Sequence, residues 1–298
     1  MNGETMTHCP AKINLGLSIF HRRKPDGYHY LASIFVPISF GDEISFTRAS
    51  SDKLVSENLL TGKPAQDFES VSERGDLKKN LLWRGLQAFA DRRDEGVRIH
   101  VRKRIPPGAG LGGGSSNVGS LLRYLGSEFG IGNSELQEAA VRLGADVPFF
   151  LEDGARLALG IGEILWPIPL GRGYGTLAMP ELTVSTRSAY EDLKRPLQET
   201  PSPETWTVLD ENARTALKNS EWGKLKRLVN DFEESVFVRH PLLARIKDAM
   251  HRNGAAFASL TGTGSAVYAL TDSKSVQIEL TAQLEEEFPE VRFAAFEF

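Results

Sequence analysis

The residues best suited to chemistry lie in a glycine-rich stretch from Arg104 to Asn117, whose sequence is Arg-Ile-Pro-Pro-Gly-Ala-Gly-Leu-Gly-Gly-Gly-Ser-Ser-Asn. The alternation of residues 97–101 predicts a strand before it, and apolar residues at helical spacing predict a helix after it. A helix N-terminus has unpaired N–H groups, and a backbone without Cβ atoms can close around phosphate oxygens. The stretch therefore predicts a phosphate cradle. A tight turn that uses glycine only for its backbone freedom is the alternative.

The glycine-rich stretch can be compared with two known phosphate-binding motifs, the Walker loop and the dinucleotide-binding fingerprint. No Gly-x-x-x-x-Gly-Lys-Ser/Thr is present, which excludes a Walker loop. Gly108-x-Gly110-x-x-Gly113 fits the dinucleotide-binding pattern by letter, but that fingerprint needs a helix that begins within the motif and a second strand after it. We expect Ser115, Ser116 and Asn117 to cap the helix, and residues 128–144 to continue as another helix. The basic residues before the loop either help to hold an anion or form a solvated strand face; they are Arg98, Arg102, Lys103 and Arg104.

Polar residues that could act with this loop occur in three other places. Residues 11–20 alternate as a strand, which puts Lys12 and Asn14 together on the face opposite the apolar one, where solvent is the alternative environment. Asp146 stands between a helix-ending glycine and a proline, where a nearby ammonium would keep it ionised and able to accept a proton; a structural turn aspartate is the alternative. A second glycine loop spans residues 260–265, where a hairpin turn is the alternative.

Composition limits the class of protein. The 298 residues suffice for one large or two moderate domains, and a 41% apolar, 25% charged chain is ordinary for a globular protein. A net charge of −4 gives no electrostatic reason to expect nucleic acid or an anionic membrane. The single cysteine, Cys9, excludes an intrachain disulfide, and no signal peptide or spanning segment is evident, so we expect a soluble cytoplasmic protein.

The remaining pattern predicts a mixture of strands and helices. We expect Asn80 to cap a helix, residues 34–46 to form a strand pair broken at Gly41-Asp42, and residues 48–78 and 196–205 to be irregular. Further strands are expected at 160–165, at 176–179 and at the C-terminus. Helices are expected at 134–143, 206–218, 221–236, 240–252 and 275–288.

Together these motifs resemble the GHMP kinase superfamily. Residues 10–15 (Pro-Ala-Lys-Ile-Asn-Leu) look like its first motif, 106–117 like its ATP-phosphate loop and 260–265 (Leu-Thr-Gly-Thr-Gly-Ser) like its third motif. Residues 23–29 (Arg-Lys-Pro-Asp-Gly-Tyr-His) and 143–150 (Leu-Gly-Ala-Asp-Val-Pro-Phe-Phe) are similar to the branch that phosphorylates a cytidylyl sugar-alcohol diphosphate on the methylerythritol phosphate route to isoprenoid precursors. The resemblance covers nearly the whole chain.

The resemblance implies a fold and a set of roles. The fold would be α+β with two domains, 1–160 and 161–298: an N-terminal ribosomal-protein-S5-domain-2-like sandwich, a C-terminal α/β sandwich and an active site in the cleft between them. Asp146 would be the general base and Lys12 its charge partner, with Mg²⁺ accompanying ATP through the phosphates. ATP would be held by Asn80, Pro106, Gly108, Gly110, Leu111, Gly112, Gly113, Gly114, Ser115, Ser116 and Asn117. The substrate would be held by Asn14, Tyr28, His29, Asp146, Tyr190 and Gly264, with the two tyrosines stacking on cytosine.

Two other functions compete with this interpretation. Another kinase of the superfamily, acting on homoserine or mevalonate, would lack a reason for the Asp-Gly-Tyr-His and Gly-Ala-Asp-Val-Pro segments. A nucleotide-binding regulator would need neither Lys12 nor Asp146. We expect the partners to be small molecules, and the chain to be a monomer or a weak homodimer.

Overall fold

The computed structural model describes residues 6–24, 26–60, 63–67, 79–198 and 209–298. Its chain forms two compact units. Unit 1 comprises Met1–Ala11, Gly41–Pro107 and Gly112–Asp153, and unit 2 comprises Lys12–Phe40, Gly108–Leu111 and Gly154–Phe298. Two long strands, β1 (Thr7–Arg23) and β2 (His29–Ala49), contribute residues to both units.

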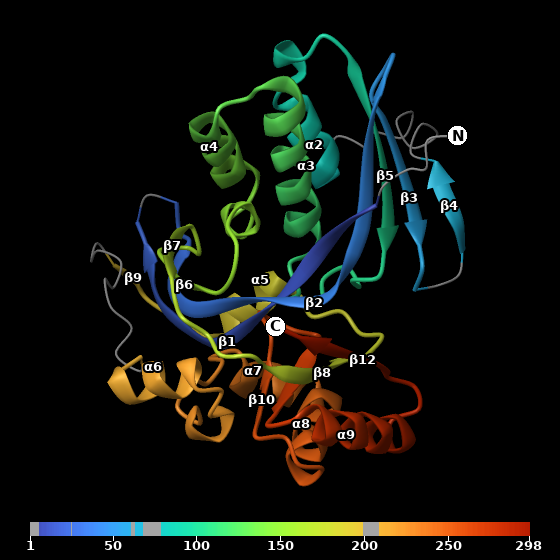
Figure 1. The fold of residues 1–298 in the computed structure, drawn as a ribbon. Coiled ribbons are helices and arrows are strands. Elements are labelled where there is room, and N and C mark those ends of the chain that lie inside the picture. The colour runs from blue at the N-terminus through green and yellow to red at the C-terminus, as the bar shows by residue number, and fades with distance from the viewer. Residues whose placement is uncertain (1–5, 25, 61–62, 68–78, 199–208) are drawn as a thin grey trace. The chain divides into compact units, whose positions relative to one another are not determined.

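Unit 1 is a sheet with helices on one face (Figure 1). The sheet has the order β4-β3-β5-β2, in which β3 (Lys53–Asn58) is parallel to β5 (Gly96–Lys103) and antiparallel to β4 (Lys63–Asp67). The helices are α2 (Leu81–Gln87), α3 (Gly113–Phe129) and α4 (Asn133–Leu143). Their core contains the apolar residues that the two periodicities predicted, Val97, Ile99, Val101, Val118, Leu121, Leu122 and Leu125. The predicted strand, glycine loop and helix are thus confirmed.

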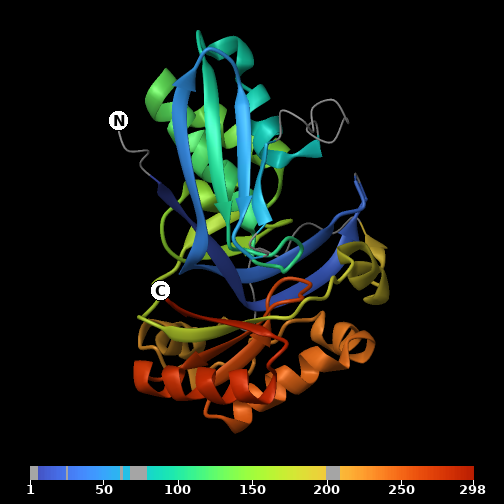
Figure 2. The same ribbon diagram turned by 90° about the vertical axis from the view of Figure 1, so that its right-hand side faces the viewer.

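Unit 2 contains a second sheet, which two helices cover on one face (Figure 2). Its antiparallel order is β10-β11-β8-β12, from β8 (Tyr174–Met179), β10 (Phe257–Leu260), β11 (Val267–Thr271) and β12 (Arg292–Glu297). The covering helices are α8 (Pro241–Arg252) and α9 (Lys274–Glu287), close to their predicted bounds. The unit also holds β6 (Arg156–Leu159), β7 (Ile164–Pro167), β9 (Leu197–Gln198), α5 (Thr186–Asp192), α6 (Glu211–Lys218) and α7 (Glu233–Arg239). Short 3-10 turns span Ala90–Arg92, Pro148–Leu151 and Trp222–Lys224.

Several local predictions were wrong, and two of them concern strands. The predicted break at Gly41-Asp42 is absent, because β2 runs through it unbroken. A Cβ on Gly41 would overlap the Cys9 carbonyl oxygen, so this glycine permits a close approach of β1 and makes no turn. The stretch 48–78 was expected to be irregular, but it contains β3 and β4; residues 61–62 and 68–78 lie outside the described part.

Two further corrections concern segments of unit 2. Residues 221–236 were expected to form one helix, but they form a 3-10 turn, an irregular stretch and then α7. The Leu17 N–H donates to the Val229 carbonyl at 2.8 Å, and the Asp231 N–H donates to the Leu17 carbonyl at 2.9 Å. This pairing with β1 uses backbone groups that a helix would have needed. The expected strand 160–165 begins only at Ile164, after a turn; most of the expected loop 196–205 lies outside the described residues.

The lengths and apolar character of the helices can be compared with what a membrane-spanning helix needs. In the described ranges, no helix combines the length and the apolar character needed to cross a bilayer.

Candidate functional site

Three motifs that lie far apart in the sequence meet within unit 2. The Lys12 N–H donates to the Leu111 carbonyl at 3.0 Å, and the Ala266 N–H donates to the Ala109 carbonyl at 3.1 Å. The Thr261 hydroxyl lies 3.2 Å from the Gly110 carbonyl oxygen. The segment 108–111 of the glycine loop is therefore held between β1 and the turn that connects β10 to β11.

The polar face of β1 is buried. Lys12 is 4% and Asn14 is 2% exposed, so the alternative that this face meets only solvent is wrong. The two side chains do share a face, as the alternation predicted, because the Lys12 Nζ donates to the Asn14 Oδ1 at 2.6 Å. The ammonium also lies 5.2 Å from the centre of the Phe35 ring. Burying an ammonium is costly, which makes Lys12 a strong candidate for a functional residue.

Asn14 makes polar contacts on every side. Its Oδ1 accepts from the Gly262 N–H at 2.9 Å as well as from Lys12, and its Nδ2 donates to the Ser33 hydroxyl at 2.9 Å. Its backbone N–H donates to the Thr261 Oγ1 at 3.1 Å, and its carbonyl accepts from the Tyr268 hydroxyl at 2.8 Å. Burial, with a smaller effect of the Glu233 charge, raises the pKa of Tyr268 well above its ordinary value, so this hydroxyl keeps its proton. Asn14 thus links Lys12 to the second glycine loop.

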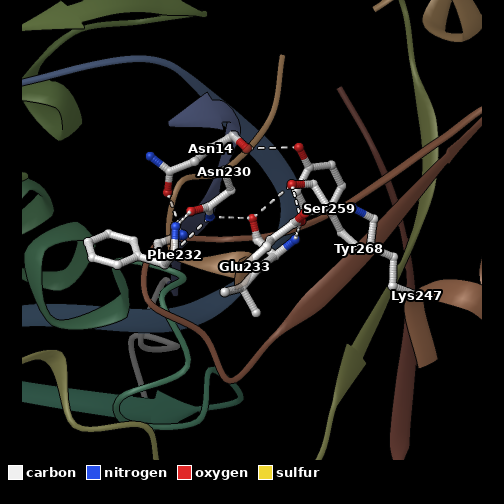
Figure 3. A network of polar contacts seen from close by, with 9 residues as sticks. Asn14, Asn230, Phe232, Glu233, Lys247, Ser259 and Tyr268 are labelled. Atoms are coloured by element: carbon white, nitrogen blue, oxygen red, sulfur yellow. Dashed lines mark hydrogen bonds and ion pairs between the residues drawn. The ribbon is translucent and has the colours of Figure 1, made fainter. Parts of the chain in front are cut away.

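The second glycine loop is a hairpin connection, as its alternative interpretation held. It joins β10 to β11, which pair from Phe257↔Leu270 to Leu260↔Val267. Gly262 has φ +57° and Gly264 has φ +86°, which only glycine adopts readily. The Asn230 side chain, which lies outside the hairpin in the sequence, fixes the loop: its Nδ2 donates to the Leu260 and Gly262 carbonyls at 2.9 and 2.8 Å. Figure 3 shows Asn230 beside Asn14 and Glu233. A hairpin can still contact a ligand, so the role of Gly264 stays a prediction.

The predicted aromatic residues of the substrate site are also in unit 2. The ring centres of His29 and Tyr190 lie 4.9 Å apart at an interplanar angle of 35°, whereas Tyr28 is 60% exposed. The pKa of His29 is lowered by burial and then by the charges of Arg22 and Arg195. A neutral imidazole offers both a donor and an acceptor, which suits recognition of a base edge.

The rest of the glycine loop opens α3 in unit 1. Gly112, with φ +69°, occupies the N-cap position, so Ser115, Ser116 and Asn117 lie inside the helix and do not cap it, contrary to prediction. The helix begins at Gly113, which removes one of the two arguments against a dinucleotide fingerprint. The other is confirmed, because α4 follows where that fingerprint needs a strand.

The hydroxyl and amide groups at the start of α3 have different surroundings. The Ser116 Oγ is buried and has no hydrogen-bond partner among the described residues. Asn117, in contrast, donates to the Asp42 Oδ2 at 3.1 Å and accepts from the Lys103 Nζ at 2.9 Å. Asp42 also accepts from Lys103 and from the backbone N–H groups of residues 104 and 105. This buried network fixes the chain where it enters the glycine loop. Ser116, whose hydroxyl lacks such a partner, is the better candidate for a ligand contact.

Two other predicted residues lie in unit 1. The Asn80 Oδ1 accepts from the Leu82 N–H at 2.9 Å, so Asn80 is the N-cap of α2, as predicted. Asp146 is half-buried in the turn between α4 and the 3-10 turn Pro148–Leu151. Of the four basic residues before the loop, three are ion-paired: Lys103 with Asp42, Arg104 with Glu43, and Arg102 with Glu43 and Glu57; Arg98 is exposed.

Sequence reasoning gave no functional place to Asp42, Asn230 and Glu233, and it selected Thr261 only as part of the second glycine loop. Each is a polar residue whose partners are distant in the chain, and Asn230, for example, contacts a carbonyl 30 residues away. Local periodicity carries no signal for such contacts. Only Asp42 had a local signal, because an acidic residue between two apolar runs of a predicted strand is unusual.

Comparisons with known proteins agree with this arrangement. Residues 80–154 match the family model described as GHMP kinases N terminal domain, and residues 213–290 match the one described as GHMP kinases C terminal. A 4-diphosphocytidyl-2-C-methyl-D-erythritol kinase of Leptospira interrogans is 41% identical over 295 residues, which cover 97% of this chain and 99% of the relative. One of Bacteroides thetaiotaomicron is 37% identical, covering 89% and 91% of the two chains.

Solved structures show the same fold. A crystal structure of 4-(cytidine 5'-diphospho)-2C-methyl-D-erythritol kinase superposes with a TM-score of 0.77 at 29% identity and covers 98% of both chains. A homoserine kinase from Cytophaga hutchinsonii superposes with a TM-score of 0.69 at 16% identity, covering 100% of this chain and 95% of its own, which shows the fold alone. The expected α+β GHMP kinase fold is therefore confirmed. The chain belongs to the GHMP kinases, and within them to the family of the 4-diphosphocytidyl-2-C-methyl-D-erythritol kinases.

Proposed function

We propose that this chain transfers the γ-phosphoryl group of ATP to the 2-hydroxyl of 4-diphosphocytidyl-2-C-methyl-D-erythritol, a step of the methylerythritol phosphate route to isoprenoid precursors. The observation that carries the proposal is the match to a kinase of that name over 97% of the chain at 41% identity. In this proposal Asp146 takes the proton of the substrate hydroxyl. Lys12 supplies positive charge to the transferring phosphoryl group and to Asp146.

The residues around the glycine loop fit a bound ATP. The buried Ser116 Oγ has no hydrogen-bond partner in the described ranges, and a phosphate oxygen or its Mg²⁺ would satisfy it. A Cβ added to Gly108 would meet nothing within 4 Å, and one added to Gly114 would meet only Leu81 Cδ2 at 3.9 Å. Both positions leave room for a phosphate beside the backbone, and the first N–H groups of α3 carry partial positive charge. ATP supplies the phosphoryl group, and Mg²⁺ neutralises phosphate charge.

The cytidylyl part of the substrate is assigned to His29, Tyr190 and Tyr28. The His29–Tyr190 contact supports an ordered aromatic surface, and the exposed Tyr28 ring supports a second one. The contacts of Asn14 within the chain support a role in holding Lys12, beside the substrate contact that the family resemblance implies. Gly264 stays a proposed substrate contact on the resemblance alone.

The test is ADP release from Mg·ATP by the purified protein. The substrate 4-diphosphocytidyl-2-C-methyl-D-erythritol, homoserine and mevalonate are offered separately, and we expect release with the first alone. Release with another alcohol would reassign the substrate, and ATP binding without turnover on any of the three would favour a regulator. Asp146→Asn should retain ATP binding and lower kcat by a factor on the order of 10² to 10⁴. Near-normal turnover of that variant would remove Asp146 from the role of base.

A further inference from the structure

We propose that Glu233, which has no place in the reaction itself, is a positioning residue that fixes the Leu260–Gly262 turn and, through Asn14, the Lys12 ammonium. The proposal rests on the proposed function, in which Lys12 acts on the transferring phosphoryl group. All the residues in this chain of contacts belong to unit 2.

Glu233 is the first residue of α7, and its two carboxylate oxygens have separate partners (Figure 3). The Oε1 accepts from the Leu260 N–H and from the Ser259 hydroxyl, both at 2.9 Å. The Oε2 accepts from the Lys247 Nζ at 2.6 Å. One oxygen therefore holds the end of β10, and the other forms the ion pair. The side chain is 14% exposed, so charged hydrogen bonds of this kind should be among the stronger ones in the unit.

The turn that Glu233 holds leads directly to Lys12. Leu260 is followed by Thr261 and Gly262, and the Gly262 N–H donates to the Asn14 Oδ1 at 2.9 Å. The same Oδ1 accepts from the Lys12 Nζ at 2.6 Å. A shift of the turn would move the Gly262 N–H and the acceptor that orients the ammonium. A displacement of about 1 Å in a catalytic group can cost about a hundredfold in rate, so the effect should be measurable.

Asn230 helps to fix the turn from the same side. Its Nδ2 donates to the Leu260 and Gly262 carbonyls, and its Oδ1 accepts from the Phe232 N–H at 3.0 Å. Within residues 230–233, Asn230 thus donates to carbonyl groups of the turn, and Glu233 accepts from its Leu260 N–H. These contacts add to the backbone pairing of residues 229 and 231 with Leu17, which replaces helix in the stretch before α7.

The division of partners between the two oxygens provides a matched control. Glu233→Ala removes both the ion pair and the acceptor for the Leu260 N–H, whereas Lys247→Met keeps that acceptor and removes the ion pair together with the contact between the ammonium and the Phe237 ring, 5.9 Å from its centre. Glu233→Gln keeps an amide oxygen that can accept from Leu260 and Ser259. The double variant Glu233→Met, Lys247→Met replaces the partly buried pair by apolar side chains of similar volume, which commonly preserves folding, but it still lacks the acceptor.

The experiment measures kcat and the KM for ATP for each variant, together with hydrogen exchange of the peptide that contains Gly262. We expect Glu233→Ala and the double variant to lower kcat at least about tenfold, with KM for ATP changed less than about threefold, and to speed exchange at Gly262. Lys247→Met and Glu233→Gln should stay within about threefold of the wild-type kcat, with exchange at Gly262 unchanged.

Two results would overturn the proposal. Equal kcat values for Glu233→Ala and Lys247→Met would show that only stability is involved, and an unchanged kcat in the double variant would show that the acceptor is dispensable. A wild-type protein without turnover on the cytidylyl substrate would instead refute the proposed function, and this inference with it. The wild-type rate, measured first, separates the two cases.

Discussion

Gly114 offers the sharpest test of whether the glycine loop binds phosphate. The chain itself gives reasons for two of its neighbours to be glycine: Gly110 has φ +76° and a Cβ there would overlap the Thr261 carbonyl, and a Cβ on Gly113 would lie 2.9 Å from Ile105. Gly114 has neither constraint. It lies in the first turn of α3, is exposed, and an added Cβ would meet only Leu81 Cδ2 at 3.9 Å.

The predicted effects of Gly114→Ala on stability and on ligand binding therefore have opposite signs. In the absence of nucleotide, alanine at a helical position should raise the free energy of unfolding by about 0.5–1 kcal/mol. If a phosphate packs against this backbone, the extra methyl group should cost about 1–3 kcal/mol of ATP binding, because inserted atoms in a tight contact cost about that much. Since about 1.4 kcal/mol is a factor of ten, the KM for ATP should rise by roughly 5- to 150-fold.

The assays are urea unfolding without nucleotide and steady-state kinetics with varied ATP. A more stable variant with an unchanged KM for ATP would refute the assignment of a phosphate to this position. A less stable variant would refute the structural reasoning, because it would mean that the methyl group meets atoms of the protein. Gly110→Ala is the control, since it should lose stability before any ligand is added.

The remaining predictions concern stability and pH. Gly108→Ala and Gly110→Ala share a positive φ, so both should lose about 1–2 kcal/mol in urea unfolding, but only the second should lose about 1–2 more, because it must break the contact with Thr261. Burial raises the pKa of Cys9 to about 11, so the unfolded chain ionises first and the wild type, unlike Cys9→Ala, should lose unfolding free energy as pH rises from 9 toward 11. The lowered pKa of His29 gives the opposite pH dependence, because the unfolded chain takes up the proton first. The free energy of unfolding should fall as pH drops below the unfolded pKa near 6.5, and it should fall less in His29→Gln, as melting temperatures would show. Asp42→Ala should cost about 3–5 kcal/mol, because the buried carboxylate is the acceptor for the partly exposed Lys103 ammonium, for the Asn117 amide and for two backbone N–H groups; adding Lys103→Met should recover part of this cost.

The sequence predicted those parts of the fold that local pattern determines. Alternation placed Val97, Ile99 and Val101 on the buried face of β5, and helical spacing placed Leu121 and Leu125 in the core beside them. The failures have a common physical origin. Gly41 looked like a turn residue because only the folded chain brings the Cys9 carbonyl against it, and residues 225–232 looked helical because their pairing with Leu17 is invisible in the local sequence.

The candidate site shows the same division. Lys12, Asn14 and the two glycine loops could be selected from residue type and spacing, because glycines and a lysine among apolar residues are unusual locally. Glu233 and Asn230 could not, because an acid and an amide near a helix start are common and the partners that connect them to the turn lie 26 to 32 residues away. Contact with a distant turn is what distinguishes them.

The burial of Lys12 connects the fold to the proposed chemistry. A lysine residue that is 4% exposed costs free energy that an apolar side chain at the same place would not, and a methionine would fill similar volume on β1. The chain nevertheless places an amide oxygen at 2.6 Å and an aromatic ring at 5.2 Å from this charge, and it holds that amide by hydrogen bonds to Gly262, Ser33 and Thr261. These two contacts orient the ammonium. In the proposed function this oriented charge acts on the transferring phosphoryl group, and for that reason we assign the residues that hold Asn14 to the proposed site.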